Sequence, residues 1–197
     1  MALRFGMTTS SLITGALLGA QSALAALIQS SSTVPALARI IDAVSAAISA
    51  NHKVLICGNG GSLCDAAHFA EELTGRFRND RRPYAAIACT DAGHITCTAN
   101  DYAFEHVFAR WVTALGQRGD VLIVLSTSGN SANCLNAAAA AKAAGVTTVA
   151  LLGKYGGQLR GACDLELIVP GETSDRIQEL HMLLLHTVVE GLEARCG

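Results

Sequence analysis

The chain has 197 residues, of which 51% are hydrophobic and 15% are charged, and its formal net charge is -2. These values suit one hydrophobic core and leave little for a second domain. The basic residues cluster only within residues 76–82. This argues against nucleic acid as a partner, and the short basic run is expected to form a solvated loop.

Seven cysteines are spaced singly along the chain, without a Cys-x-x-Cys pair. An odd number of scattered cysteines is typical of reduced thiols in the cytosol and not of a disulfide framework. Several of them fall within apolar segments, where burial is expected. The sequence therefore predicts a cytoplasmic protein.

The first segment is a run of apolar and small residues. Arg4 followed by residues 11–27 superficially imitates a secretory signal, but Gln21 and small polar residues interrupt the run. The same interruptions argue against a membrane span and against the membrane as a partner. Apolar residues recur within the run at a helical spacing, which predicts a packed helix. These residues are Leu17, Ala20, Leu24, Leu27 and Ile28.

One domain is predicted over residues 10–197. Residues 1–9 are expected to be an extension that is disordered or added by cloning, since Met7 would begin a chain as sensible as the one that Met1 begins. The remaining sequence contains no internal repeat, long linker or low-complexity tract that would divide it further.

Strands and helices alternate along the rest of the chain. The periodicity predicts strands at residues 53–57, 85–89, 121–125, 147–152 and 165–169. It predicts helices at residues 35–50, 63–73, 92–98 and 102–116, an alanine-rich helix up to residue 144, and a last helix at 175–194. Such alternation is typical of an α/β fold whose parallel sheet is covered on both faces, that is, a three-layer αβα sandwich.

A glycine-rich loop follows the first predicted strand, with the sequence Gly58-Asn59-Gly60-Gly61-Ser62. Glycine lets the backbone approach a ligand closely, and ligands of open α/β sheets bind at the carboxyl ends of the strands. The Gly-x-Gly-x-x-Gly spacing of dinucleotide-binding loops is not met. The alternative is a tight turn without a ligand.

A serine-rich loop follows the third predicted strand, with the sequence Ser126-Thr127-Ser128-Gly129-Asn130-Ser131. It concentrates hydroxyls and free N–H groups where a strand ends and a helix begins, which favours phosphate binding. Because the loop lacks lysine and the Gly-x-x-x-x-Gly-Lys spacing, a small phosphorylated metabolite fits better than ATP. The alternative is an ordinary turn that caps the helix.

Two predicted helices carry candidate metal ligands. His68 and Glu72 are four residues apart and share one helix face, while Gln178 and His186 lie about two turns apart on the last helix. Imidazole and carboxylate at this spacing can bind a divalent metal. Three alternatives remain open: a surface His/Glu pair, a capping box in which Gln178 pairs with Asp175, and a core histidine at position 186.

Several separated motifs resemble, in the same order, the phosphoheptose isomerases, a family with the sugar isomerase (SIS) fold. The motifs lie at residues 57–62, 65–76, 100–101, 126–131 and 175–181, and the resemblance covers the chain from Ser10 onward. Members convert sedoheptulose 7-phosphate to D-glycero-D-manno-heptose 7-phosphate, the first step of ADP- or GDP-heptose precursor synthesis. The resemblance implies a flavodoxin-like fold with a five-stranded parallel sheet and a homotetramer with active sites between subunits.

The resemblance also implies roles for individual residues. One Zn²⁺ per subunit would be held by His68, Glu72, Gln178 and His186, with Glu72 and His186 as the catalytic acid/base pair. Arg76 and Asp175 match positions near the site whose roles are open. The implied substrate-binding residues are Asn59, Gly60, Gly61, Glu72, Asn100, Asp101, Ser126, Thr127, Ser128, Ser131 and Gln178.

The chemistry of an aldose–ketose isomerase agrees with these residues. Moving a carbonyl between C1 and C2 through an enediol requires a base for a carbon-bound proton, a second acid/base group and stabilisation of an oxyanion. Two alternatives are kept: an isomerase of another sugar phosphate, and a non-catalytic SIS-fold protein that senses sugar phosphates or takes part in replication initiation. The pathway that the product would feed is left open.

Overall fold

The computed structural model of the chain describes residues 8–196. Its centre is a five-stranded parallel sheet with the strand order β2-β1-β3-β4-β5. The predicted α/β fold with a five-stranded parallel sheet is confirmed. The strands are β1 Val54–Gly58, β2 Ala86–Ala88, β3 Val121–Ser126, β4 Thr147–Leu152 and β5 Leu165–Ile168.

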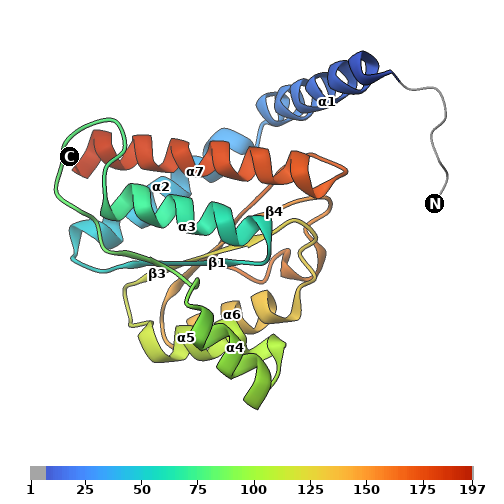
Figure 1. The fold of residues 1–197 in the computed structure, drawn as a ribbon. Helices are drawn as coiled ribbons and strands as arrows, with labels where there is room; N and C mark the ends of the chain where they lie inside the picture. The colour runs from blue at the N-terminus through green and yellow to red at the C-terminus, as the bar shows by residue number, and fades with distance from the viewer. Residues whose placement is uncertain (1–7, 197) are drawn as a thin grey trace.

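Helices cover both faces of the sheet (Figure 1). One face is packed against α2 Thr33–Ser49, α3 Gly61–Thr74 and α7 Ser174–Cys196, and the other against α4 Ala92–Asp101, α5 Val107–Leu115 and α6 Ala132–Ala143. Side chains of a strand alternate between the two faces, so Val54 and Ile56 enter the first core while Leu55 and Cys57 enter the second.

Two connections contain short 3₁₀ helices, at Phe104–His106 and Gly157–Leu159. The first of these replaces the start of the predicted helix 102–116, because α4 continues to Asp101 and α5 begins only at Val107. The other predicted helices and strands lie within a few residues of their expected bounds.

The register of the sheet places the two predicted binding loops side by side. Gly58 at the end of β1 pairs with Leu125 near the end of β3, so the glycine loop and the serine loop leave the same edge of the sheet. Parallel strands bring their carboxyl ends together at one edge, where α/β proteins bind ligands.

The first helix, α1 Thr9–Gln29, projects from the body of the molecule (Figure 1). The predicted helix is confirmed, but the expected packing is not, since Leu17 is 67% and Ile28 is 71% exposed and only Leu27 is buried. With a mean hydropathy of 1.7, α1 is long and apolar enough to span a membrane by length and composition alone. By length and composition, therefore, Gln21 and the small polar residues do not exclude a membrane span.

The expected extension over residues 1–9 falls mostly outside the described residues, which begin at Thr8. Thr8 accepts a hydrogen bond from the Ser11 backbone N–H, which caps α1. Helix α1 then begins at Thr9. The boundary at residue 10 and the nature of residues 1–7 stay predictions.

Candidate active site

Helices α3 and α7 lie side by side and bring three candidate residues together (Figure 1). The Glu72 Oε1 atom is 3.3 Å from His68 Nε2 on the same helix and 3.2 Å from His186 Nε2 on α7. The three potential ligand atoms lie within 4.8 Å of one another. Phe77 stacks on the His186 ring with a centroid separation of 5.8 Å, which helps to fix the ring.

The Glu72 carboxylate is buried and incompletely satisfied. The residue is 5% exposed, and among residues 8–196 its Oε2 atom has no hydrogen-bond partner. Burial raises the pKa of Glu72 above its ordinary value, while the imidazoles of His186 and His68 oppose the shift. A buried carboxylate oxygen without a donor is costly, so this arrangement suits a group that binds a cation or accepts a proton.

The donor set fits a zinc ion. Two imidazole nitrogens and a carboxylate oxygen are common zinc ligands, and the unpartnered Glu72 Oε2 atom gives the carboxylate further capacity to bind. The His68 and His186 side chains are 48% and 33% exposed, so the group is open to the outside on the histidine side.

Gln178 lies at the other end of α3. Its side-chain amide packs against Gly61, where an added Cβ would come within 2.6 Å of the Gln178 Oε1 atom, and its Nε2 atom is 3.5 Å from Ser62 Oγ. Gly61 begins α3 and Glu72 lies in its last turn, so the two are about 16 Å apart along the helix axis. The structure thus brings Gln178 to Gly61, and its role as a zinc ligand stays a prediction.

The serine loop is shaped by its own hydroxyls. Ser126 Oγ accepts a hydrogen bond from the Gly129 N–H at 3.0 Å, and Ser128 Oγ accepts one from the Asn130 N–H at 3.2 Å. Gly129 has a φ of +66°, a conformation that favours glycine. Ser131 is the N-cap residue of α6, yet its side chain makes no capping hydrogen bond. Its hydroxyl is therefore available to a ligand at the helix N-terminus.

Thr127, in the middle of the same loop, reaches the beginning of α7. Its Oγ1 atom is 3.2 Å from Ser174 Oγ. The serine loop is thereby connected to the helix that carries Gln178 and His186.

An asparagine that sequence reasoning missed ties the two loops together. Asn59 Nδ2 donates to Asn133 Oδ1 at 2.9 Å, and Asn133 Nδ2 donates back to Asn59 Oδ1 at 2.8 Å. Asn133 is buried in the first turn of α6. The Asn59 side chain, predicted to bind substrate, is thus engaged by Asn133. The position of Asn133 two residues after Ser131 was the only signal in the sequence.

Asn100 and Asp101 lie away from the other candidates. They are exposed at the end of α4, a helix that packs on the opposite face of the sheet from α3 and α7, and Asn100 Nδ2 donates to Asp101 Oδ1 at 2.8 Å. Arg76 is exposed, and the exposed Asp175 accepts a hydrogen bond from its neighbour Arg176. A single chain does not bring Asn100 and Asp101 to the histidine pair, because α4 lies on the opposite face of the sheet.

The basic run at residues 76–82 is not uniformly solvated, and that expectation is wrong for one residue. The Arg81 side chain is 2% exposed, whereas the Arg78 side chain is 64% exposed.

All seven cysteines are free thiols, as expected, and Cys57, Cys89 and Cys134 are buried. Burial raises the pKa of Cys89 and Cys134 to about 12, so these thiols are unreactive.

Comparisons with known proteins agree with this geometry. Residues 20–153 match the model of the SIS domain. A phosphoheptose isomerase of Fusobacterium nucleatum subsp. nucleatum is 61% identical over 141 residues, which cover 72% of this chain and 73% of the relative. The chain belongs to the phosphoheptose isomerase family.

Other members of the phosphoheptose isomerase family match over nearly the whole chain. The enzyme of Tolumonas auensis is 46% identical over 183 residues, which cover 92% of this chain and 95% of the relative. The structure of phosphoheptose isomerase GmhA from Neisseria gonorrhoeae superposes with a TM-score of 0.89 at 36% identity, covering 95% of this chain and 100% of that chain.

Proposed function

We propose that the chain interconverts sedoheptulose 7-phosphate and D-glycero-D-manno-heptose 7-phosphate through an enediol. As a member of the phosphoheptose isomerase family, it is an aldose–ketose isomerase. The observation that carries the assignment of the reacting group is the Glu72 carboxylate, which is buried between two imidazoles with one oxygen unpartnered among the described residues.

Glu72 is proposed as the base. Isomerisation removes a proton from C2 or C1 and returns it to the other carbon, while a second proton moves between the two oxygens. Burial raises the pKa of Glu72 above its ordinary value, which makes the carboxylate more basic and suits a general base. His186, 3.2 Å from Glu72 Oε1, would move the proton between the substrate oxygens.

A zinc ion, one per subunit, is proposed at His68, Glu72 and His186. Gln178, the predicted fourth ligand, lies beside Gly61 at the other end of α3 in this chain. When bound, the ion would act as a Lewis acid that polarises the carbonyl. The two oxygens of Glu72 have different surroundings, since Oε1 faces both imidazoles and Oε2 has no partner within residues 8–196. One carboxylate could therefore bind the ion through one oxygen and accept the proton on the other.

The serine loop is proposed to hold the phosphate. Ser126, Thr127, Ser128 and Ser131 place hydroxyls at the carboxyl end of β3, and the N-terminus of α6 adds backbone N–H groups. Ser131, whose hydroxyl makes no capping bond, is the best placed to meet an anion. Asn59, Gly60, Gly61 and Gln178 would contact the sugar between the loop and α3.

A homotetramer with active sites between subunits is part of the proposal. Two observations support it: α1 exposes apolar side chains such as Leu17 and Ile28, and Asn100 and Asp101 lie on the opposite face of the sheet from α3. A second subunit would cover α1 and supply the Asn100–Asp101 pair.

We further propose a cytoplasmic location and neither a nucleic acid nor a membrane partner.

The test is to incubate the purified protein with sedoheptulose 7-phosphate and follow the products by NMR. The expected result is the aldose heptose 7-phosphate, with slower turnover of pentose and hexose phosphates. Faster turnover of a pentose or hexose phosphate would favour the isomerase of another sugar phosphate. Binding without turnover of any of them would favour a non-catalytic sensor and contradict the proposal.

A further inference from the structure

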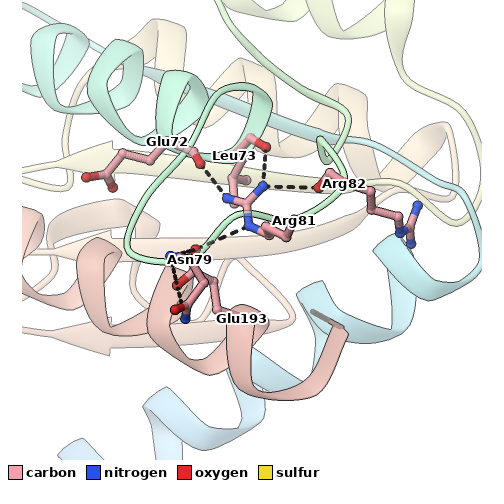
Figure 2. A network of polar contacts seen from close by, with 6 residues as sticks. All are labelled: Glu72, Leu73, Asn79, Arg81, Arg82 and Glu193. Carbon is pink, nitrogen blue, oxygen red and sulfur yellow. Dashed lines mark hydrogen bonds and ion pairs between the residues drawn. The ribbon is translucent and has the colours of Figure 1, made fainter.

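Arg81 lies in the segment after α3, and its guanidinium is buried beneath the end of that helix. Its Nη2 atom donates to the Glu72 carbonyl oxygen at 2.5 Å, and its Nη1 atom donates to the Leu73 carbonyl oxygen at 3.0 Å (Figure 2). The guanidinium carbon lies 4.2 Å from the centre of the buried Tyr84 ring. The planar group is thus held both at its edge and on its face.

The end of α3 needs these donors. The last carbonyl groups of a helix have no partner within the helix, and α3 has no basic residue in its last turn. Glu72 and Leu73 are both buried, which limits their access to water. The Leu73 carbonyl also accepts the Tyr84 backbone N–H at 2.9 Å, so the Glu72 carbonyl is the one that depends on Arg81 for a donor from outside the helix. Arg81 also brings a positive charge, which is favourable at a helix C-terminus.

The same guanidinium also contacts α7. Arg81 Nε lies 3.4 Å from Glu193 Oε1, and the Glu193 side chain is likewise buried. Asn79 donates to this carboxylate from its backbone and from its side chain. Glu193 follows His186 by about two turns, so both side chains project from one side of α7. Arg81 therefore joins α3 to α7 on the side from which His186 reaches Glu72.

We propose that Arg81 is a positioning residue of the active site: it fixes the Glu72 backbone relative to α7 and so holds the Glu72 carboxylate beside His186. This inference rests on the proposed role of Glu72 as base. In Figure 2 the Glu72 side chain points away from Arg81 while its carbonyl oxygen faces the guanidinium. A displacement of about 1 Å at a reacting group can cost on the order of a hundredfold in rate.

The geometry separates this role from an electrostatic one. Arg81 bonds to the Glu72 carbonyl oxygen, whereas the Glu72 carboxylate faces His68 and His186. The guanidinium acts on the backbone of Glu72 and not on its charge. Its loss is therefore expected to lower kcat while leaving phosphate binding at the serine loop unchanged.

The experiment compares Arg81→Ala and Arg81→Lys with Arg82→Ala as the matched control. Arg82 is the next residue, and its guanidinium also lies over the Tyr84 ring, at 5.5 Å, but it donates to the Ile48 carbonyl oxygen at the end of α2. For each variant, kcat and KM for sedoheptulose 7-phosphate, inhibition by inorganic phosphate and thermal unfolding are measured.

The expected result is that kcat of Arg81→Ala falls by about tenfold to a hundredfold, with KM and inhibition by phosphate close to those of the wild type. Arg82→Ala should keep the wild-type kcat. Free guanidinium, at concentrations too low to unfold the protein, should restore part of the kcat of Arg81→Ala alone. Arg81→Lys should lie in between, because an ammonium cannot both stack on Tyr84 and donate along two fixed directions.

Wild-type kcat in folded Arg81→Ala, or an equal loss in Arg82→Ala, would overturn the inference. If Arg81→Ala does not fold, Arg81→Lys is used instead, and a wild-type kcat in that variant would likewise overturn the inference. If the wild type itself leaves sedoheptulose 7-phosphate unchanged, the proposed function fails separately. The crystal structure of Arg81→Lys then tests the inference: a separation of Glu72 Oε1 and His186 Nε2 beyond 3.2 Å supports it, and an unchanged separation overturns it.

Discussion

Asp120, just before β3, and Glu72, in the last turn of α3, are both buried carboxylates, exposed by 1% and 5% respectively. Asp120 accepts hydrogen bonds from the backbone N–H groups of Lys53 and Gln117 at 3.0 and 2.9 Å, and Lys53 Nζ lies 2.6 Å away. Glu72 faces two imidazoles instead, and no donor within residues 8–196 reaches its Oε2 atom.

The pKa values of the two carboxyl groups are consequently shifted in opposite directions from their ordinary values. Burial alone would raise the pKa of Asp120, but the hydrogen bonds from Lys53 and Gln117 outweigh it and lower the pKa below its ordinary value. For Glu72 burial prevails and the pKa is raised. A compensated carboxylate at the amino edge of the sheet stabilises the fold, whereas an under-compensated one between two helices is ready for chemistry.

The largest expected difference between the Asp120 and Glu72 regions is in the free energy of unfolding. Asp120→Asn should destabilise the protein by about 3 kcal/mol, the lower end for a broken buried ion pair because Lys53 remains partly exposed. The matched substitution Glu72→Gln should not lower the free energy of unfolding, because it removes a buried charge that lacks full compensation. Urea denaturation of both variants measures the difference.

At acid pH the contribution of Asp120 to the free energy of unfolding should be lost. Because the pKa of Asp120 is lower in the folded than in the unfolded state, its contribution is complete above the unfolded pKa and is lost as the pH falls through the folded one. The stability difference between the wild type and Asp120→Asn should therefore shrink in acid. A difference that stays constant with pH would contradict the role given to Asp120.

The next effect concerns the metal. His68→Ala and His186→Ala should each weaken zinc binding by more than the roughly 10- to 100-fold that loss of an outer hydrogen-bond partner costs. The fold should survive, because both side chains are partly exposed. Zinc titration checks this, with His106→Ala as the control, since the exposed His106 lies in the 3₁₀ helix before α5. Unchanged zinc affinity in both variants would remove these residues from the site.

A smaller effect is expected at the serine loop. Ser128→Ala should weaken competitive inhibition by inorganic phosphate by about tenfold to a hundredfold, since a hydrogen bond to a charged group contributes about 1.5–3 kcal/mol. The exposed hydroxyl of Ser49 on α2 provides the control variant Ser49→Ala. Equal inhibition of both variants would indicate that this loop is only a turn.

Features that depend on local periodicity could be predicted from the sequence. The alternation of strands and helices gave the fold class, and the four-residue spacing of His68 and Glu72 placed them on one face of α3. The positions of the glycine and serine loops after buried strands put them at one edge of the sheet. Each of these inferences needs only the geometry of a single element or of two parallel strands.

Features that depend on contacts between distant segments could not be predicted in this way. Arg81 looked like part of a solvated run because its partners, the end of α3 and Glu193 on α7, are set by helix packing. The reciprocal bonding of Asn59 and Asn133 has the same origin. The exposed face of α1 likewise could not be read from its helical spacing, since that spacing does not reveal what covers it.

The most direct test of the central claim, that Glu72 is the base of the isomerase, is the turnover of sedoheptulose 7-phosphate by Glu72→Gln. This substitution keeps the shape and a possible oxygen ligand but removes basicity. The predicted result is a fall in kcat of at least about a hundredfold, with inhibition by inorganic phosphate unchanged and with Asp120→Asn, measured under conditions where it is folded, retaining wild-type kcat. Near-normal turnover by Glu72→Gln would contradict the account.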